Sequence, residues 1–221
     1  MNAENSAKSN LKYDFLWAVT IGAALTIMLI PPMADRYQWM NTNFPYMTAF
    51  LKFMLLAPMG ELLARRIRTR EWKVPSYIIA RALVWGFLGM VIALAFQLFS
   101  GGVIAAIEKG FLPQSESALL NAFMISAIMN VIFAPVMMAF HRFTDTFFDL
   151  WYEGTSPTLN MIVEKIDWGQ FFSVVIAKTI PFFWIPAHTI TFLLPSEYRV
   201  MMAAVLSIAL GMILALAKRN G

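Results

Sequence analysis

Long apolar runs separated by short polar gaps are the feature that most constrains how this chain can fold. The hydrocarbon core of a lipid bilayer is about 30 Å thick, and an α-helix crosses it with about 20 predominantly apolar residues. Six runs are close to or above that length, and they cover residues 15–33, 45–64, 77–99, 117–140, 168–194 and 200–217. We therefore predict an all-α fold, in which one integral membrane domain forms a six-transmembrane-helix bundle.

The composition agrees with a membrane protein. Of the 221 residues, 59% are hydrophobic and 14% are charged, whereas soluble domains have about 45–50% apolar and about 25% charged residues. The first ten residues are polar and no small-residue cleavage site follows the first run, so we expect no cleavable signal peptide. The absence of cysteine excludes disulfides, thiol catalysis and thiolate metal sites. A net charge of +4 is ordinary for a membrane protein and does not indicate a nucleic-acid partner.

The distribution of basic residues predicts how the protein is oriented. Six crossings place both termini on one side of the membrane, and the gaps on that side include the strongly basic stretch 65–73. The basic residues on that side are Lys8, Lys12, Arg65, Arg66, Arg68, Arg70, Lys73, Arg81, Arg142, Lys165, Lys218 and Arg219. The opposite gaps contain only Arg36, Lys109 and Arg199. Because basic loops stay in the cytoplasm, we predict cytoplasmic N and C termini in a bacterial inner (plasma) membrane or an equivalent one.

The longest internal gap, 141–167, has its own helical pattern. Phe143, Phe147, Leu150 and Trp151 recur at helical spacing, and charged residues occupy the other faces. This pattern predicts an amphipathic helix on the cytoplasmic surface, broken near residues 155–157. A solvated linker is the alternative.

The fifth apolar run carries the most informative polar residues. Lys178 lies about ten residues inside the run, where an ionisable side chain costs about 2.5–3.5 kcal/mol to insert. Pro181 and Pro186 have no backbone N–H, so in an α-helix they leave the carbonyls of Ala177 and Phe182 without donors and bend the helix. His188 follows. We predict a polar cavity here, with the alternative that Lys178 forms a structural pair with a neighbouring helix.

Two further polar positions accompany this prediction. In the fourth run Asn130 recurs at near-helical spacing with other polar residues, so it either faces the same interior as Lys178 or forms an interhelical hydrogen bond. Glu61 precedes Arg65 by four residues, which is the spacing of a helical ion pair. We expect this pair to have a structural role near the cytoplasmic end, with proton relay as the alternative.

Small residues mark surfaces where helices approach closely. In the last run every fourth residue is small, and the third run contains two shorter patterns of the same kind. The residues in the last run are Ala203, Ser207, Gly211 and Ala215. Their neighbour is another helix of the chain by default, with a second copy or a partner membrane protein as alternatives.

Catalytic patterns are absent from the sequence. The two histidines, His141 and His188, are predicted near opposite membrane faces and cannot easily share a metal ion. No phosphate-binding loop, nucleophile elbow or paired-histidine zinc helix occurs. We predict no enzymatic activity, no cofactor and no metal site.

Residues 183–200 resemble the C-terminal signature of the Mpv/PMP family of small peroxisomal and mitochondrial inner-membrane proteins. The residues at or near the family positions are Trp184, Pro186, Phe192, Pro195, Tyr198 and Arg199. His188 stands where the family has glutamine, and Thr191 stands where it has asparagine. The family is usually described with four spans, so the first run would be additional here. The resemblance implies a channel-like membrane protein.

Together these observations predict a small-solute membrane channel or transporter. The candidate substrate-binding residues are Lys178, His188, Asn130, Trp184 and Thr191. The candidate structural or gating residues are Pro181, Pro186, Glu61, Arg65 and Arg199. The expected partners are the lipid bilayer and an unidentified small solute. The alternative is a non-transporting scaffold or substrate-capture subunit that acts with a partner complex.

Overall fold

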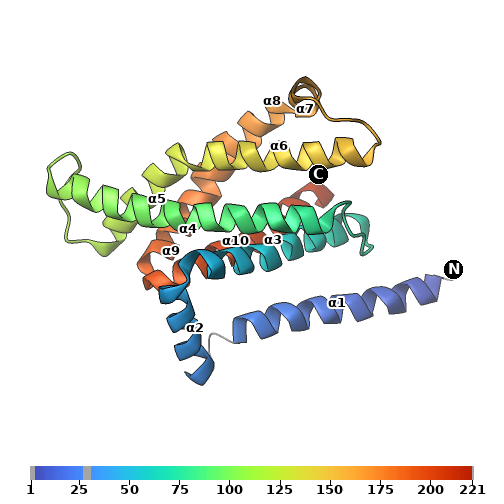
Figure 1. Ribbon diagram of the computed structural model, residues 1–221, viewed down its shortest axis with the longest axis horizontal. Coiled ribbons are helices and arrows are strands. Elements are labelled where there is room, and N and C mark those ends of the chain that lie inside the picture. Colours follow the sequence, from blue (N-terminus) through green and yellow to red (C-terminus); the bar gives the residue numbers. More distant parts are fainter. Residues whose placement is uncertain (1–2, 27–30, 221) are drawn as a thin grey trace.

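A computed structural model describes residues 3–26 and 31–220, which form helices and no strand (Figure 1). Before the bundle come α1 (Ala3–Thr26) and α2 (Pro31–Asn43). The bundle follows with α3 (Pro45–Thr69), α4 (Ile78–Glu108), α5 (Ala118–Ile132), α6 (Ala134–Tyr152), α7 (Leu159–Lys165), α8 (Trp168–Gln170), the π-helix η1 (Phe171–Trp184), α9 (Ile185–Leu193) and α10 (Ser196–Asn220). The predicted all-α fold is confirmed for these residues.

Four to five segments of the described chain are long and apolar enough to cross a membrane. Four are single stretches, namely Pro45–Thr69, Ile78–Glu108, Trp168–Leu193 and Ser196–Ile213. The fifth is formed by α5 and α6 together, which are bent by 44°. The first predicted run, 15–33, spans the end of α1 and the start of α2, and its residues 27–30 lie outside the described residues. Helix α1 is not among the candidate spans found in the described residues.

Helix α3 packs against both α4 and α10, and small residues allow the close approach. A Cβ atom added at Gly89 of α4 would lie 2.6 Å from the Ala49 carbonyl oxygen of α3. A Cβ atom added at Gly211 of α10 would lie 3.2 Å from the carbonyl oxygen of Gly60, again in α3. The small residues predicted from the sequence at these two positions therefore pack inside the chain.

The bend between α5 and α6 follows from a proline. Pro135 lies in the first turn of α6, where its missing N–H is tolerated and its ring ends the preceding helix. Helix α6 then continues to Tyr152, so the first part of the predicted segment 141–167 prolongs the fourth apolar run. The rest turns at Gly154, which has a positive φ of 80°, and forms α7.

The apolar face of the segment 141–167 packs against the segment itself. Leu150 of α6 and Ile162 of α7 are buried together with Ile166 in a small apolar cluster. Phe143 and Phe147 pack against this cluster. The helical spacing of the apolar residues therefore corresponds to a real packing face, which joins the end of α6 to α7.

The fifth run contains a π-helix where a bent α-helix was predicted. At its end the Ile185 N–H donates to the Ile180 carbonyl, five residues earlier. Because π-helical bonds span five residues, the carbonyl that faces Pro181 is that of Ile176. The prediction that the Ala177 carbonyl loses its donor to Pro181 assumed α-helical spacing.

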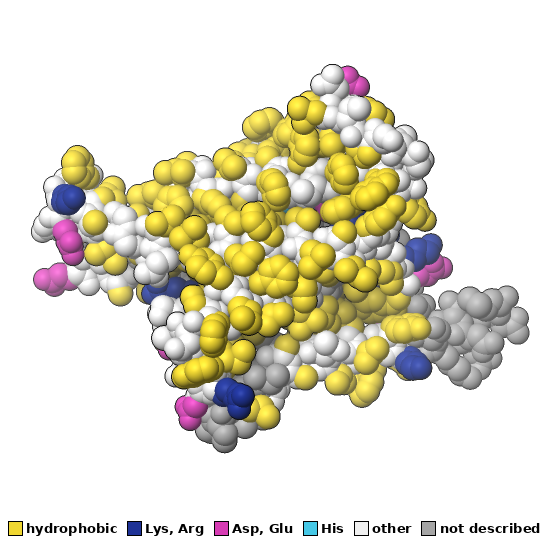
Figure 2. All heavy atoms as spheres, in the orientation of Figure 1, with side chains coloured by type: hydrophobic (Ala, Val, Ile, Leu, Met, Phe, Trp, Pro, Cys, Tyr) yellow, Lys and Arg dark blue, Asp and Glu magenta, His cyan; other side chains and the backbone are white. Residues whose placement is uncertain are grey.

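Side chains on the surface are distributed as in a membrane-spanning bundle. Figure 2 shows hydrophobic side chains over the middle of the visible face, while most of the charged side chains visible there lie toward its two ends. The loop between α3 and α4, the end of α6, the first turn of α1 and the last turn of α10 lie toward the same end in Figure 1. The chain is thus an α-helical membrane protein by composition and by form.

Candidate functional site

The helices bring polar side chains together in two places. The first, which we call the imidazole–amide cluster, consists of Ser126, Asn130, Trp184 and His188. The second, which we call the charged cluster, consists of Glu61, Arg81, His141, Asp145 and Asp149. The imidazole–amide cluster contains three of the five residues predicted to bind substrate, namely Asn130, Trp184 and His188.

A hydrogen-bonded pair between α5 and α9 forms the centre of the imidazole–amide cluster. The His188 side chain is 8% exposed and Asn130 is 1% exposed. His188 Nδ1 lies 3.2 Å from Asn130 Oδ1 and 3.1 Å from Asn130 Nδ2. Asn130 Nδ2 also donates to the Ser126 carbonyl at 2.8 Å. The imidazole can therefore donate to the amide oxygen or accept from the amide nitrogen, depending on its tautomer.

Aromatic rings hold the imidazole in place. The Trp184 ring stacks on His188 with centroids 5.0 Å apart, and the Phe96 ring meets His188 edge-on at 5.5 Å. Trp184 Nε1 is buried and has no hydrogen-bond partner in the described part of the chain. A buried donor without a partner is rare in proteins, so this N–H is available to a bound polar group.

The junction between η1 and α9 is tied to α5 through one carbonyl. The oxygen of Ile185 accepts hydrogen bonds from Ser126 Oγ and from Thr189 Oγ1, each at 2.7 Å. Pro186 lies in the first turn of α9. Because a break in a helix at membrane depth must have its backbone groups satisfied by protein or water, the Ser126 hydroxyl stabilises this junction.

Lys178 does not join the imidazole–amide cluster. Its side chain is exposed on η1, as are Phe172 (61%) and Phe182 (81%). Among the described residues no hydrogen bond or ion pair to its ammonium group is found. Its role in binding stays a prediction, and its side chain lies on the exposed surface of η1.

Two other predicted residues have backbone partners. Thr191 is fully buried, and its Oγ1 donates to the Ala187 carbonyl within α9. Arg199 donates to the carbonyls of Leu194 and Phe192, at 2.9 and 3.1 Å. Arg199 therefore closes the end of α9 where the chain turns into α10.

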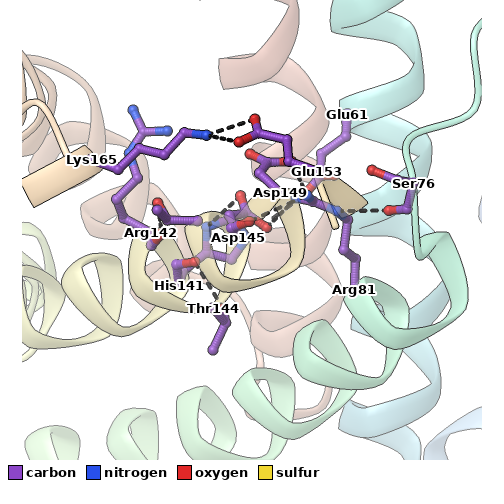
Figure 3. A network of polar contacts seen from close by, with 11 residues as sticks. Glu61, Ser76, Arg81, His141, Arg142, Thr144, Asp145, Asp149, Glu153 and Lys165 are labelled. Atoms are coloured by element: carbon purple, nitrogen blue, oxygen red, sulfur yellow. Dashed lines mark hydrogen bonds and ion pairs between the residues drawn. The ribbon is translucent and has the colours of Figure 1, made fainter. Parts of the chain in front are cut away.

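The charged cluster joins α3, α4 and α6 (Figure 3). Arg81 of α4 is 7% exposed, and its Nη1 lies 2.5 Å from Asp145 Oδ1. Its Nη2 lies 2.7 Å from Asp149 Oδ1, and its Nε donates to the Ser76 carbonyl at 3.1 Å. The guanidinium group thus holds two carboxylates that are one helical turn apart on α6.

Glu61 and His141 complete the charged cluster. Trp85 Nε1 donates to Glu61 Oε1 at 2.6 Å, and the Trp85 ring lies 4.1 Å from the His141 ring. His141 Nε2 is 3.7 Å from Glu61 Oε1, and His141 Nδ1 is 3.6 Å from Asp145 Oδ2. Glu61 therefore pairs across helices, and no ion pair with Arg65 is found in the described residues.

The charged cluster was not recognised from the sequence. His141, Asp145 and Asp149 follow one another at intervals of four residues, which places them on one face of α6. Arg81 and Trp85 have the same spacing on α4. These two patterns indicate that the charged residues share one face of each helix. They do not indicate that α4 and α6 pack together, or that α3 adds Glu61.

Helix α1 is attached to the bundle outside both clusters. Asp14 forms hydrogen bonds with Arg66 Nε and Nη2, each at 2.9 Å, and accepts from Trp72 Nε1 at 2.8 Å. Trp17 Nε1 donates to the Met59 carbonyl. The hydrogen bond with Arg66 keeps the pKa of the Asp14 carboxyl below its ordinary value, although partial desolvation acts in the opposite direction.

Two hollows on the surface are lined by residues outside both clusters. One, of about 370 Å³, is lined by apolar side chains of α4 and α5, including Phe99, Val103 and Ile128. The other, of about 460 Å³, lies beside the first turns of α4. Neither contains a residue of the imidazole–amide or charged cluster.

The fold and the two clusters define the class of the protein as a polytopic α-helical membrane protein with buried polar groups. No protein-family model matches the chain, and no curated protein or solved structure is a significant match to it. The function therefore has to be argued from the clusters themselves.

Proposed function

We propose that the protein is a small-solute channel or transporter and that its solute passes the imidazole–amide cluster. The observation that carries this proposal is the buried Asn130–His188 pair at the junction of η1 and α9. Buried polar side chains inside membrane spans are costly and mark substrate pathways by default. A π-helical segment is rare and frequently accompanies a functional site.

The interrupted fifth run supports the same proposal. Membrane transporters commonly form their substrate sites where a helix is broken near the middle of the bilayer. Pro181 and Pro186 interrupt the bonding of this run, and Trp184 lies between them. The resemblance of residues 183–200 to the Mpv/PMP family agrees with a channel-like protein.

The polar groups indicate the kind of solute. The Trp184 N–H is a free donor, and the imidazole of His188 can donate or accept a hydrogen bond. A small solute with a carbonyl or carboxylate oxygen would match these groups. The basic residues of loop 65–73 favour a cytoplasmic position for this loop in a bacterial inner membrane. Both termini are then cytoplasmic provided that the first apolar run also crosses the bilayer.

A scaffold or substrate-capture subunit is the second candidate, and Lys178 is the observation that favours it. An exposed lysine on a spanning helix would face lipid, at a cost of about 2.5–3.5 kcal/mol near mid-span. A second copy or a partner membrane protein that covers this face of η1 would remove that cost. Gly211 gives this candidate no support, because it packs on α3.

Solute flux through liposomes tests the proposal. We expect liposomes that contain the purified protein to release a subset of small carboxylate- and carbonyl-bearing solutes. With the variant Asn130→Leu the rate of this efflux should be at least tenfold lower. Gln97→Leu is the matched control, because Gln97 is an exposed amide on α4. Equal flux from Asn130→Leu and Gln97→Leu would refute a path at the imidazole–amide cluster.

The same assay separates the two candidates. If the wild type releases no solute, the subunit candidate gains, and crosslinking then compares the wild type with Lys178→Met. Loss of a crosslinked partner in Lys178→Met would support a covered η1 face. Unchanged flux in Lys178→Met, together with a loss in Asn130→Leu, would support transport without Lys178.

A further inference from the structure

We propose that Glu61, His141 and Asp145 bind a divalent first-row transition-metal ion. Glu61 comes from α3, and His141 and Asp145 come from α6 (Figure 3). The proposal concerns the charged cluster and does not depend on transport at the imidazole–amide cluster.

The spacing of the three side chains is the first argument. One ligand atom from each residue lies within 4.8 Å of the other two. His141 Nε2 is 3.7 Å from Glu61 Oε1, which is too long for a hydrogen bond of about 2.7–3.2 Å. Two ligands held at about 2.1 Å from one ion at a tetrahedral angle are about 3.4 Å apart. The imidazole and carboxylate are therefore spaced much like two ligands of one ion.

The third ligand, Asp145, approaches the other nitrogen of the same ring. Asp145 Oδ2 lies 3.6 Å from His141 Nδ1. One ion is coordinated by one nitrogen of an imidazole, so binding through Nε2 requires the Asp145 carboxylate to turn toward Nε2 while Arg81 holds its Oδ1.

Charge is the second argument. Glu61, Asp145 and Asp149 carry three negative charges, and Arg81 supplies one positive charge. With a neutral imidazole the charged cluster has an excess of two negative charges. Asp149 is 55% exposed, so solvent screens its charge. An excess of one negative charge remains among Glu61, Asp145 and Arg81. Uncompensated buried charge is costly, and a cation bound by Glu61 and Asp145 would balance it.

Neighbouring donors already orient the two carboxylates. Trp85 Nε1 donates to Glu61 Oε1, and Arg81 Nη1 donates to Asp145 Oδ1. Glu61 Oε1, the oxygen 3.7 Å from His141 Nε2, therefore accepts one hydrogen bond and would bind the ion through its other lone pair. Within the described chain Asp145 Oδ2 has no hydrogen bond. Metal ligands are typically held by hydrogen bonds of this kind from the surrounding protein.

The ligand types select the metal. Imidazole nitrogen suits zinc, copper, iron and nickel, whereas Mg²⁺ and Ca²⁺ prefer oxygen ligands alone. One nitrogen and two carboxylates therefore favour a transition metal over Mg²⁺. Three protein ligands leave at least one coordination position open to water or a solute.

Calorimetric titration of the purified full-length protein with Zn²⁺ tests the proposal. We expect one Zn²⁺ per chain, binding at least tenfold weaker in Glu61→Gln and in His141→Gln, and much weaker binding of Mg²⁺. Glu153→Gln is the matched control, because Glu153 pairs with Lys165 outside the three ligands. Unaltered Zn²⁺ binding in His141→Gln, or no Zn²⁺ binding by the wild type, would overturn the proposal.

A second measurement uses the wild-type protein alone, so it does not depend on the folding of any variant. Diethyl pyrocarbonate modifies accessible histidines, and mass spectrometry reports each site separately. We expect Zn²⁺ to slow the modification of the partly exposed His141 at least fivefold, while the buried His188 is unaffected. Equal modification with and without Zn²⁺ would mean that His141 only forms ion pairs with the two carboxylates.

Discussion

The packing of α4 on α3 gives a prediction whose size can be worked out from the structure. A Cβ atom at Gly89 would lie 2.6 Å from the Ala49 carbonyl oxygen and 2.7 Å from Phe53 Cβ. Both are rigid neighbours, because one is backbone and the other is the first atom of a side chain. The variant Gly89→Ala must therefore push the two helices apart.

The expected cost follows from two opposing terms. Overpacking a tight contact costs typically about 1–3 kcal/mol. Alanine is a better helix former than glycine by about 1 kcal/mol, which offsets part of this cost. We expect Gly89→Ala to lower the free energy of unfolding by about 0–2 kcal/mol.

A second glycine in the same helix is the control. A Cβ atom at Gly101 would meet nothing within 4 Å. Gly101→Ala therefore keeps only the helix-forming term and should raise the free energy of unfolding by about 0.5–1 kcal/mol. The two variants are otherwise the same change in α4.

Unfolding by sodium dodecyl sulfate in mixed micelles, followed by circular dichroism, measures both free energies. The expected difference between Gly101→Ala and Gly89→Ala is about 2 kcal/mol. If Gly89→Ala is as stable as Gly101→Ala, the close packing of α3 and α4 is refuted. The placement of Glu61 beside Trp85 would then lose its basis, because α3 carries Glu61 and α4 carries Trp85.

Three further predictions concern polar contacts. The hydrogen bond with Arg66 lowers the pKa of Asp14, so Asp14 should hold α1 on the bundle fully above pH ~4 and release it as the pH falls through the lowered pKa. Tryptophan fluorescence would follow this release. Asp14→Asn should remove the transition, and a transition that persists in this variant would contradict the contact. Arg81→Met should lower the free energy of unfolding by about 2–4 kcal/mol, and the double variant with Asp145→Asn should recover part of this loss; no recovery would argue against the ion pair. Ser126→Ala should lower the free energy of unfolding by about 0.6 kcal/mol, because one interhelical hydrogen bond is lost. A cost near zero would mean that this hydrogen bond does not stabilise the fold.

Four to five of the six predicted spans have counterparts in the described residues, because length and hydropathy alone determine whether a helix can cross a bilayer. The first run has no counterpart in this part of the chain, since α1 ends at Thr26 and is not among the candidate spans. The helix predicted at the start of 141–167 is present as the end of α6, but its contact with α4 could not be predicted. Asp145 and Asp149 bind Arg81, which offsets the cost of their position against α4. Only the contact between α6 and α4 reveals this, and no local pattern encodes it.

The candidate site could be predicted in part. Asn130 and His188 were recognised as polar residues within apolar runs, and they form one hydrogen-bonded pair. The sequence predicts Lys178 in the same cavity, because it gives the depth of this residue along the helix. It does not give the side of the helix that the Lys178 side chain faces. The π-helical spacing of residues 171–184 changes which side of the helix each residue faces, and no sequence pattern predicts this spacing.

Aqueous access to the imidazole–amide cluster is the most direct test of a solute path there. The natural chain has no cysteine, so Ser126→Cys and Phe182→Cys each provide a single reactive thiol in the protein reconstituted in liposomes. We predict that a small charged methanethiosulfonate reagent labels Ser126→Cys at least tenfold faster than Phe182→Cys, which is 81% exposed on the outer face of η1, and that a transported solute slows the first reaction. A thiol at position 126 that stays unlabelled in folded protein would contradict a path through the imidazole–amide cluster.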